Sequence, residues 1–324
     1  MRSLPPERPL RNGRRRAGSK RHVRPPCYAV VMDGRSRHAE LVERLIAMVE
    51  AGTAPWQKPW DASSGLPPWP RSAISGRPYR GMNFLALLST GLADPRWCTP
   101  RQAERRGWRV RSGARASTVW FFAKISPRDT RTGKKYIVQR LAQVFNIGDL
   151  DGPPAHDAPS PVDDTYSAAA EVMARSGAEV FHGADRACYL EPTDSIHLPD
   201  AQTFRGIGDY YATALHELAH WTGHRTRLDR RFGRFGDPEY AREELRAEIA
   251  SLMLSSLVGV PHDPGPHASY VASWLAVLRR DRREIVRAAS DAQRIVDWLC
   301  ASEEVPKCSQ APISSARVRI ARRS

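Results

Sequence analysis

The sequence predicts an α+β protein made of two successive regions, a small mixed α/β region and a second region that is mainly helical. Three observations support this division. Residues 96–125 and 134–150 alternate β-branched or aromatic side chains with charged ones, as half-buried strands do. Residues 165–300 contain several stretches with helical character. Between them, "DGPPAHDAPSPVDD" (151–164) combines Pro, Gly and Asp without periodicity, which indicates a linker.

The first region is expected to begin with a helix. In "SRHAELVERLIAMVEAG" (36–52), Ser36 is a plausible N-cap and Gly52 a stop signal. One face of this helix carries the apolar residues Leu41, Leu45, Met48 and Val49. A loop rich in Pro and Trp then leads to a short helix and to the strands of a small sheet. The first region therefore spans residues 36–150.

The second region, residues 165–300, is expected to open with a helix near 165–176. Two extended segments follow, "AEVFHG" and "ACYLEPTDSIHLPD", and then the helix that contains "HELAH". A further helix covers about 240–257, and a last helical pair covers about 268–300. The flanking segments, 1–35 and 301–324, are predicted to be a disordered basic arm and a loose basic tail. Translation starting at Met32 is an alternative explanation of the arm.

The charge of the chain favours a polyanionic partner. Among its 324 residues, Lys and Arg outnumber Asp and Glu by 50 to 35, for a net charge of +15. Apolar runs near 18 residues are absent from the sequence, so we expect no membrane association and a soluble, cytoplasmic protein. The cysteines are scattered and odd in number, which favours reduced thiols over disulfides: Cys27, Cys98, Cys188, Cys300 and Cys308.

The stretch "ATALHELAHWTGH" (212–224) predicts a metal site. Residues four apart lie on one face of a helix, so His216 and His220 can direct both imidazoles at one ion. Glu217 lies beside that face, where it could accept a proton from water and pass it to a leaving amine. The flanking residues are apolar, and burying these three polar groups would be costly unless a metal satisfied them. We expect one Zn²⁺ per chain, with another divalent metal as the alternative.

A third ligand is expected from the following helix. The metzincin spacing would require a histidine at position 226, but Thr226 stands there, and His224 comes too early. Downstream, "REELRAEIASLML" carries Glu244 and Glu248 four apart on an otherwise apolar helix. This pattern resembles gluzincins, which take a third ligand from such a helix. We assign Glu244 as the ligand and Glu248 as its supporting partner, with the reverse assignment left open.

Two neighbouring segments have weaker candidate roles. "SIHLPD" (195–200) precedes the metal-binding helix, where zincins keep an edge strand that can pair with an extended peptide. His197 within it is expected to be a surface residue rather than a ligand. Tyr210 and Tyr211 could line the pocket, although packing is the favoured interpretation.

The first region interleaves aromatic and cationic residues, a combination that binds single-stranded nucleic acid through stacking and phosphate contacts. The sequence has neither a zinc finger nor a bZIP signature, so we expect single strands rather than duplex readout. Most single Trp residues are nevertheless expected to belong to the core. The candidate DNA-binding residues are Trp56, Lys58, Trp60, Arg77, Tyr79, Arg80, Asn83, Trp108 and Arg109.

Taken together, the two regions resemble the ArdC-type antirestriction proteins of mobile elements. The segments that carry the resemblance are "ELVERLIAMVEAGTAPWQKPW", "GRPYRGMNFLAL", "VFNIGDLDG", "YYATALHELAHWTGHRTRLDRRFG" and "YAREELRAEIAS". The resemblance implies a single-stranded-DNA-binding domain followed by a zincin-like metallopeptidase domain. It implies that His216, Glu217 and His220 carry the H-E-x-x-H motif and that Glu244 is the third ligand.

Two functions from different classes follow from this interpretation. The protein could be a peptidase that hydrolyses a host protein, such as a restriction enzyme, or itself near single-stranded DNA. Alternatively it could coat incoming single-stranded DNA, with a metal that is purely structural. A primase accessory protein is a third alternative. A structural zinc site is usually closed by four protein ligands and has no use for a neighbouring glutamate, which favours the enzyme.

Overall fold

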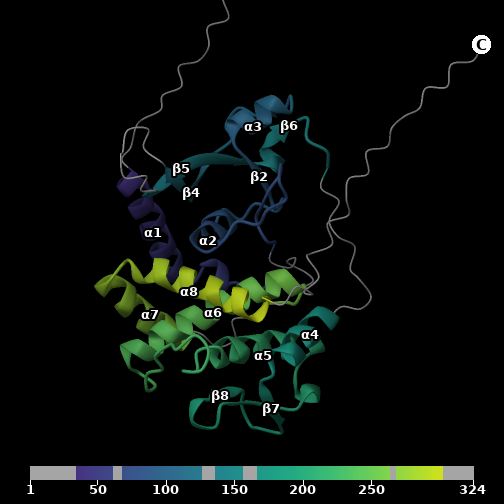
Figure 1. Ribbon diagram of the computed structural model, residues 1–324, viewed down its shortest axis with the longest axis vertical. Coiled ribbons are helices and arrows are strands. Elements are labelled where there is room, and N and C mark those ends of the chain that lie inside the picture. The colour runs from purple at the N-terminus through teal and green to yellow at the C-terminus, as the bar shows by residue number, and fades with distance from the viewer. Residues whose placement is uncertain (1–33, 61–67, 126–135, 156–165, 263–267, 302–324) are drawn as a thin grey trace, which may run out of the picture. The chain divides into compact units, whose positions relative to one another are not determined.

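The computed structural model describes residues 34–60, 68–125, 136–155, 166–262 and 268–301 (Figure 1). The predicted basic arm, except Gly34 and Arg35, most of the predicted linker and the tail beyond Ala301 lie outside these residues, as do Cys27 and Cys308. The domain boundaries drawn from the sequence therefore stay a prediction. Within the described part of the chain, helices are combined with small sheets whose strand pairs are mostly antiparallel, which confirms the predicted α+β class.

The N-terminal region contains short helices around a small sheet. Its sheet has the order β1-β2-β5-β4, with β1 parallel to β2 and the other neighbours antiparallel. The strands β3 and β6 form a separate antiparallel pair. The elements are α1 (Gly34–Glu50), the 3-10 turn η1 (Pro55–Gln57), β1 (Arg71–Ser72), α2 (Met82–Leu88), β2 (Arg96–Cys98), α3 (Pro100–Arg105), β3 (Arg109–Val110), β4 (Ser117–Ile125), β5 (Tyr136–Asn146), the 3-10 turn η2 (Ile147–Asp149) and β6 (Leu150–Asp151).

The C-terminal region places a three-stranded sheet beside a group of helices. The strand order is β7-β9-β8, with β9 parallel to β7 and antiparallel to β8. The elements are α4 (Ser167–Ser176), β7 (Glu179–His182), β8 (Cys188–Leu190), η3 (Glu191–Thr193), β9 (Ser195–Leu198), η4 (Ala201–Thr203), α5 (Ile207–Trp221), α6 (Pro238–Val258), α7 (Ala268–Arg280) and α8 (Glu284–Leu299).

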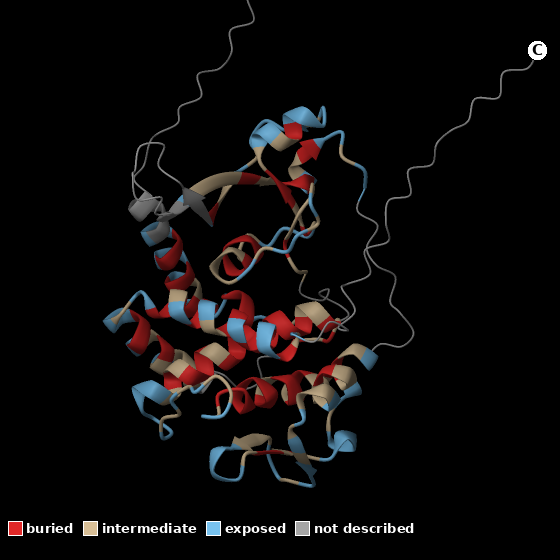
Figure 2. Ribbon diagram, in the orientation of Figure 1, coloured by how far each residue is buried: buried red, intermediate tan, exposed pale blue. Residues whose placement is uncertain are grey.

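Helix α6 lies at the centre of the largest hydrophobic cluster. Most of its residues are buried, because it packs against α5, α7 and α8 and also against η1 of the N-terminal region. In Figure 2 the buried residues accordingly concentrate on α5, α6 and α8. Leu45 on α1, Trp56 in η1 and Phe84 on α2 belong to the same cluster. The two regions therefore share one core.

Three expectations differ from the structure. The first helix begins at Gly34, so Ser36 lies inside it and is not the N-cap. The segment 96–125, expected to be extended, contains the short helix α3, which Thr99 caps by accepting a hydrogen bond from the Gln102 amide. "SIHLPD" is not an edge strand, because β9 lies in the centre of its sheet and β7 and β8 form the edges. In addition, the described helices include none with the length and apolarity that crossing a membrane requires.

Candidate functional site

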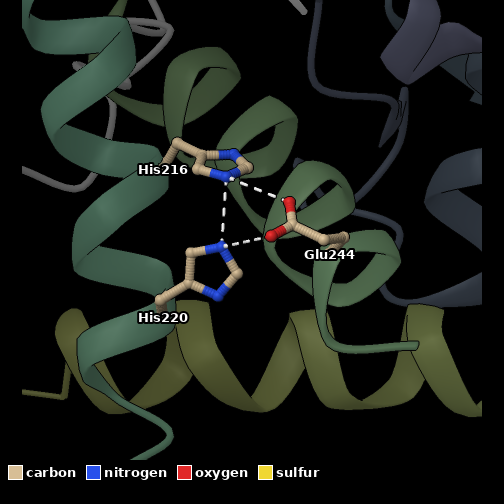
Figure 3. A group of neighbouring side chains, drawn as sticks. All are labelled: His216, His220 and Glu244. Carbon is tan, nitrogen blue, oxygen red and sulfur yellow. Dashed lines mark hydrogen bonds and ion pairs between the residues drawn. The ribbon is translucent and has the colours of Figure 1, made fainter. Parts of the chain in front are cut away.

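Helix α5 carries the two histidines of the motif on one face. Leu215 and Leu218 are fully buried on its other sides, which fixes the rotation of the helix about its axis. The i, i+4 spacing then brings the Nε2 atoms of His216 and His220 to 3.2 Å from each other. Figure 3 shows the two rings on successive turns, directed toward the same point.

Glu244 on α6 completes the group from the opposite side. Its Oε2 lies 3.7 Å from His216 Nε2, and its Oε1 lies 3.6 Å from His220 Nε2 (Figure 3). One ligand atom from each of the three residues lies within 4.8 Å of the other two. The structure thus brings together the three residues that the sequence predicts as metal ligands, and it places Glu244 rather than Glu248 beside both Nε2 atoms.

Two further carboxylates fix the tautomers of the histidines. Glu248 Oε1 lies 3.2 Å from His216 Nδ1, and Glu243 Oε1 lies 3.2 Å from His220 Nδ1. A carboxylate only accepts hydrogen bonds, so each Nδ1 carries a proton, and Nε2 is the atom of each ring that can bind a metal. Burial lowers the pKa of both histidines, but the neighbouring carboxylates outweigh it and raise the pKa, for His220 to about 9. The two Nε2 atoms and the Glu244 oxygens all face one point, so these residues fit a divalent cation that would take the place of the Nε2 protons.

The sequence does not reveal how Glu243 is held. Arg230 donates to it from Nη2 at 2.7 Å and from Nε at 2.9 Å, and both side chains are almost completely buried. Burial alone would raise the pKa of Glu243, but hydrogen bonds from His220 and Arg230 outweigh it and hold the pKa below its usual value. Glu243 therefore stays charged beside His220.

The same arginine also ends helix α5. Arg230 Nη2 donates to the Ala219 carbonyl at 2.7 Å, and Nη1 donates to Thr222 Oγ1 at 2.9 Å. A Cβ atom on Gly223 would come within 2.9 Å of the His220 backbone carbonyl oxygen, and also within 2.9 Å of Arg230 Nη2. Glycine is therefore needed at 223 for this close approach, beyond its role in stopping the helix.

Glu217 faces the edge strand β8. Its side chain is buried, and the backbone amide of Tyr189 on β8 donates a hydrogen bond to its carboxylate. Burial raises the pKa of Glu217 above its usual value, while the neighbouring His216 and His220 oppose that shift. A carboxylate with a raised pKa accepts and returns a proton near neutral pH more readily than an ordinary glutamate does.

Comparisons with known proteins match both regions. Residues 35–147 match the domain family described as the N-terminal domain of anti-restriction factor ArdC, and residues 167–291 match a zincin-like metallopeptidase family. The crystal structure of the metal-free antirestriction ArdC protein from plasmid R388 is 39% identical, with a TM-score of 0.66. The match covers 81% of this chain and 95% of that one. The chain belongs to the ArdC family of antirestriction proteins.

Other relatives extend this comparison. The Mn(II)-bound structure of the same R388 ArdC protein is 37% identical, with a TM-score of 0.66, and the match covers 82% of this chain and 97% of that one. A DNA primase, TraC from Escherichia coli, is 44% identical, but the match covers 82% of this chain and only 27% of the primase. This ArdC-family chain therefore spans about a quarter of that relative. An uncharacterized protein, y4eC from Sinorhizobium fredii (strain NBRC 101917 / NGR234), is 33% identical over 82% of this chain and 92% of its own length.

The remaining candidates near the metal centre have packing roles. His197 on β9 contacts Ser195 Oγ at 3.1 Å and stacks on Phe181, away from the three ligands. Tyr210 contacts His182 Nε2 at 3.0 Å through its hydroxyl, and Tyr211 stacks on Tyr166. The strand edge next to Glu217 is β8, so an extended peptide would pair there and not with β9 as the sequence suggested.

Three of the candidate DNA-binding residues are engaged inside the protein. Trp56 is completely buried, so its ring has no free face on which a base could stack, and its assignment is corrected to the core. Asn83 bonds both backbone groups of Trp120, donating from Nδ2 to its carbonyl at 2.6 Å and accepting from its amide at 2.8 Å. Trp60 packs partly against the core and donates from Nε1 to the Pro55 carbonyl at 2.9 Å.

The other candidates lie in two exposed places. Lys58, Arg77 and Arg80 are exposed, although Arg80 forms an ion pair with Asp297 on α8. Tyr79 is half-buried, and burial raises its pKa to about 12. Trp108 and Arg109 line an open hollow of about 740 Å³ that α3 and β3 form together. Arg101 and Glu104 also line this hollow, and Arg105 and Arg106 are exposed on the same segment.

Proposed function

We propose that this ArdC-family protein is a divalent-metal-dependent peptidase that cleaves a protein near single-stranded DNA in the cytoplasm. The observation that carries the proposal is the convergence of His216, His220 and Glu244 beside the buried carboxylate of Glu217. Three protein ligands leave a coordination position open, as catalytic sites do and structural sites do not. The Mn(II) in the R388 relative supports a divalent ion, and zinc is the ion that the motif favours.

The residues divide the chemistry between them. A divalent ion in this position polarises a carbonyl group and makes water more acidic. Glu243 and Glu248 keep the two imidazoles in the orientation and tautomer that ligands need. Glu217 accepts the proton of the attacking water and returns it to the leaving amine. The edge strand β8, apart from the Tyr189 amide that already donates to Glu217, offers main-chain groups that hold the peptide by hydrogen bonds.

Metal dependence tests the proposal. The full chain, loaded with Zn²⁺ or Mn²⁺, is incubated with single-stranded DNA and a recipient-cell lysate, and protein fragments are identified by mass spectrometry. We expect fragments that disappear when the chain is stripped with a chelator and return when metal is restored. Lysate treated with metal alone is the control for host peptidases. If the metal-loaded chain generates no fragment beyond that control, the metal has a structural role and DNA binding is the leading function.

We further propose that the hollow beside Trp108 binds single-stranded DNA. Two exposed arginines, Arg101 and Arg109, line the hollow together with Glu104 and one half-buried indole, and Arg105 and Arg106 are exposed on the same segment. This set supplies cations for phosphates and an aromatic face for a base. The location differs from η1, where the sequence alone placed several contacts. α3 contributes most of the charge, since it carries Arg101 and Arg105 and is followed by Arg106.

Replacing Trp108 with Ala tests this second proposal. We expect the affinity for a single-stranded oligonucleotide to fall by about 1–3 kcal/mol, as alanine substitution at a stacking residue does. Affinity should also decrease steeply with salt in wild type, because arginine–phosphate contacts release counterions. Fluorescence anisotropy at several salt concentrations measures both effects. Trp298→Ala, which removes a partly exposed Trp from α8, is the matched control. Equal effects of the two substitutions, or equal affinity for duplex DNA, would count against the hollow.

A further inference from the structure

Three aromatic residues lie together on one side of the metal centre. The Phe235 ring meets the Tyr240 ring edge-on at 5.5 Å between centroids, and it meets the Tyr270 ring at 6.4 Å. The Tyr240 and Tyr270 rings are 6.0 Å apart, with their hydroxyl oxygens at 3.3 Å. We call these three residues the aromatic wall. They come from the loop before α6, from α6 itself and from α7.

The aromatic wall is continuous with the ligand set. Tyr240 and Glu244 are four residues apart on α6, so they occupy the same face one turn apart. Burial raises the pKa of Tyr240, and the nearby Glu244 carboxylate, which accepts a hydrogen bond from the tyrosine hydroxyl, raises it further. The inner end of the wall therefore touches a metal ligand, and the outer end is Phe235.

Phe235 is exposed although its backbone is tightly held. Its side chain has 78% of its surface exposed, the largest fraction among the described large hydrophobic residues. A turn holds it: the Asp237 amide donates to the Arg234 carbonyl at 2.9 Å, and Gly236 has a φ of 92°, which favours glycine. A Cβ on Gly233 would come within 2.3 Å of the Tyr240 amide nitrogen, so this loop is packed directly on the start of α6.

An exposed aromatic surface in a fixed position beside a metal centre suits a large apolar side chain. A nucleobase also stacks on aromatic rings, and the charges at the outer end of the wall are mixed: Asp237 and Arg234 are exposed there, and Glu239 pairs with Arg242. The inner end touches the Glu244 carboxylate, which would repel a phosphate and is compatible with an apolar side chain.

We propose that the aromatic wall binds an aromatic or large aliphatic side chain of the peptide substrate, next to the bond that is cleaved. This inference rests on the proposed peptidase function and adds the class of substrate that the site prefers. Phe235 would cover the outer face of the bound side chain, and Tyr240 would mark its inner end.

Peptide binding tests the proposal separately from cleavage. Two capped pentapeptides with the sequences Gly-Gly-Phe-Gly-Gly and Gly-Gly-Ala-Gly-Gly are titrated by NMR into the full chain, both without metal and with Zn²⁺, which is diamagnetic. We expect wild type to bind the Phe peptide at least tenfold more tightly than the Ala peptide. Phe235→Ala should bring this ratio close to one. Phe181→Ala, which removes another exposed aromatic ring from the distant strand β7, should leave the ratio unchanged.

The outcomes separate the two proposals. Equal affinity for both peptides, or a preference that Phe235→Ala does not reduce, would overturn the role of the wall. Displacement of the Phe peptide by a short single-stranded oligonucleotide would assign the surface to DNA instead. A preference that depends on Phe235, without cleavage of either peptide or of lysate proteins, would support the wall and argue against the peptidase function. Circular dichroism of both variants establishes that they are folded.

Discussion

Replacing Glu217 with Gln is expected to lower metal-dependent peptide hydrolysis by a factor of about 10²–10⁴, the range that general-base catalysis contributes. The amide has nearly the size of the carboxylate, and its oxygen can still accept the hydrogen bond from the Tyr189 amide. The glutamine amide cannot take a proton from water, however. His216, His220 and Glu244 are unchanged, so the metal content should remain that of wild type.

Two measurements on the same samples check this result. Fragment yield by mass spectrometry gives the rate, and elemental analysis gives the metal content per chain. Glu191→Gln is a suitable control, because Glu191 is an exposed glutamate in η3 outside the ligand set. If Glu217→Gln cleaves as fast as wild type while its metal content is unchanged, Glu217 is not the base. If it still protects DNA from restriction, DNA binding rather than hydrolysis carries the antirestriction effect.

Replacing Arg230 with Met is expected to lower the free energy of unfolding by about 3–5 kcal/mol, because it leaves one charge of a buried ion pair without its partner. Glu243 would keep His220 as its partner, and the Ala219 carbonyl at the end of α5 would keep the hydrogen bond from Thr222 Oγ1 but lose the one from Arg230. Since Glu243 orients His220, metal affinity should also fall by about 10–100-fold.

Urea unfolding with and without metal measures the first effect, and competition with a coloured chelator measures the second. Arg225→Met is the matched control, because Arg225 is exposed in the same loop. Combining Arg230→Met with Glu243→Gln should recover part of the lost stability, since the uncompensated charge is then removed. An effect of Arg230→Met no larger than that of Arg225→Met would show that the buried pair contributes little.

The sequence was most informative where function depends on local geometry. The i, i+4 spacing of His216 and His220 determines their convergence on any regular helix, so these residues could be found without a fold. Glu244 could be found because Glu244 and Glu248 stand four residues apart among the apolar residues of the next helix. The role of Arg230 could not be predicted from the sequence, because its contact with Glu243 depends on how the loop after α5 folds back.

Other features depended on strand order and burial, which one sequence does not specify. The stretch 195–198 has the composition of either an edge or a central strand, and only pairing with both β7 and β8 places β9 in the middle. Trp56 and Trp108 both stand among basic residues, yet one is buried and the other borders a hollow. Helix α3 could have been predicted from the sequence, because Thr99, Pro100 and Gln102 form a capping box with proline in the first turn.

The packing of η1 on α6 has a thermodynamic consequence. Trp56 lies against the helix that supplies Glu243, Glu244 and Glu248, and the buried His262, just after α6, contacts the Trp56 carbonyl oxygen at 3.0 Å. The proposed DNA-binding hollow lies elsewhere in the N-terminal region, so DNA would reach the ligand carboxylates only by changing how η1 packs on α6. Linkage is reciprocal: the factor by which single strands change the affinity for metal equals the factor by which metal changes the affinity for single strands. The concentration of available metal would then change the affinity of the chain for single-stranded DNA.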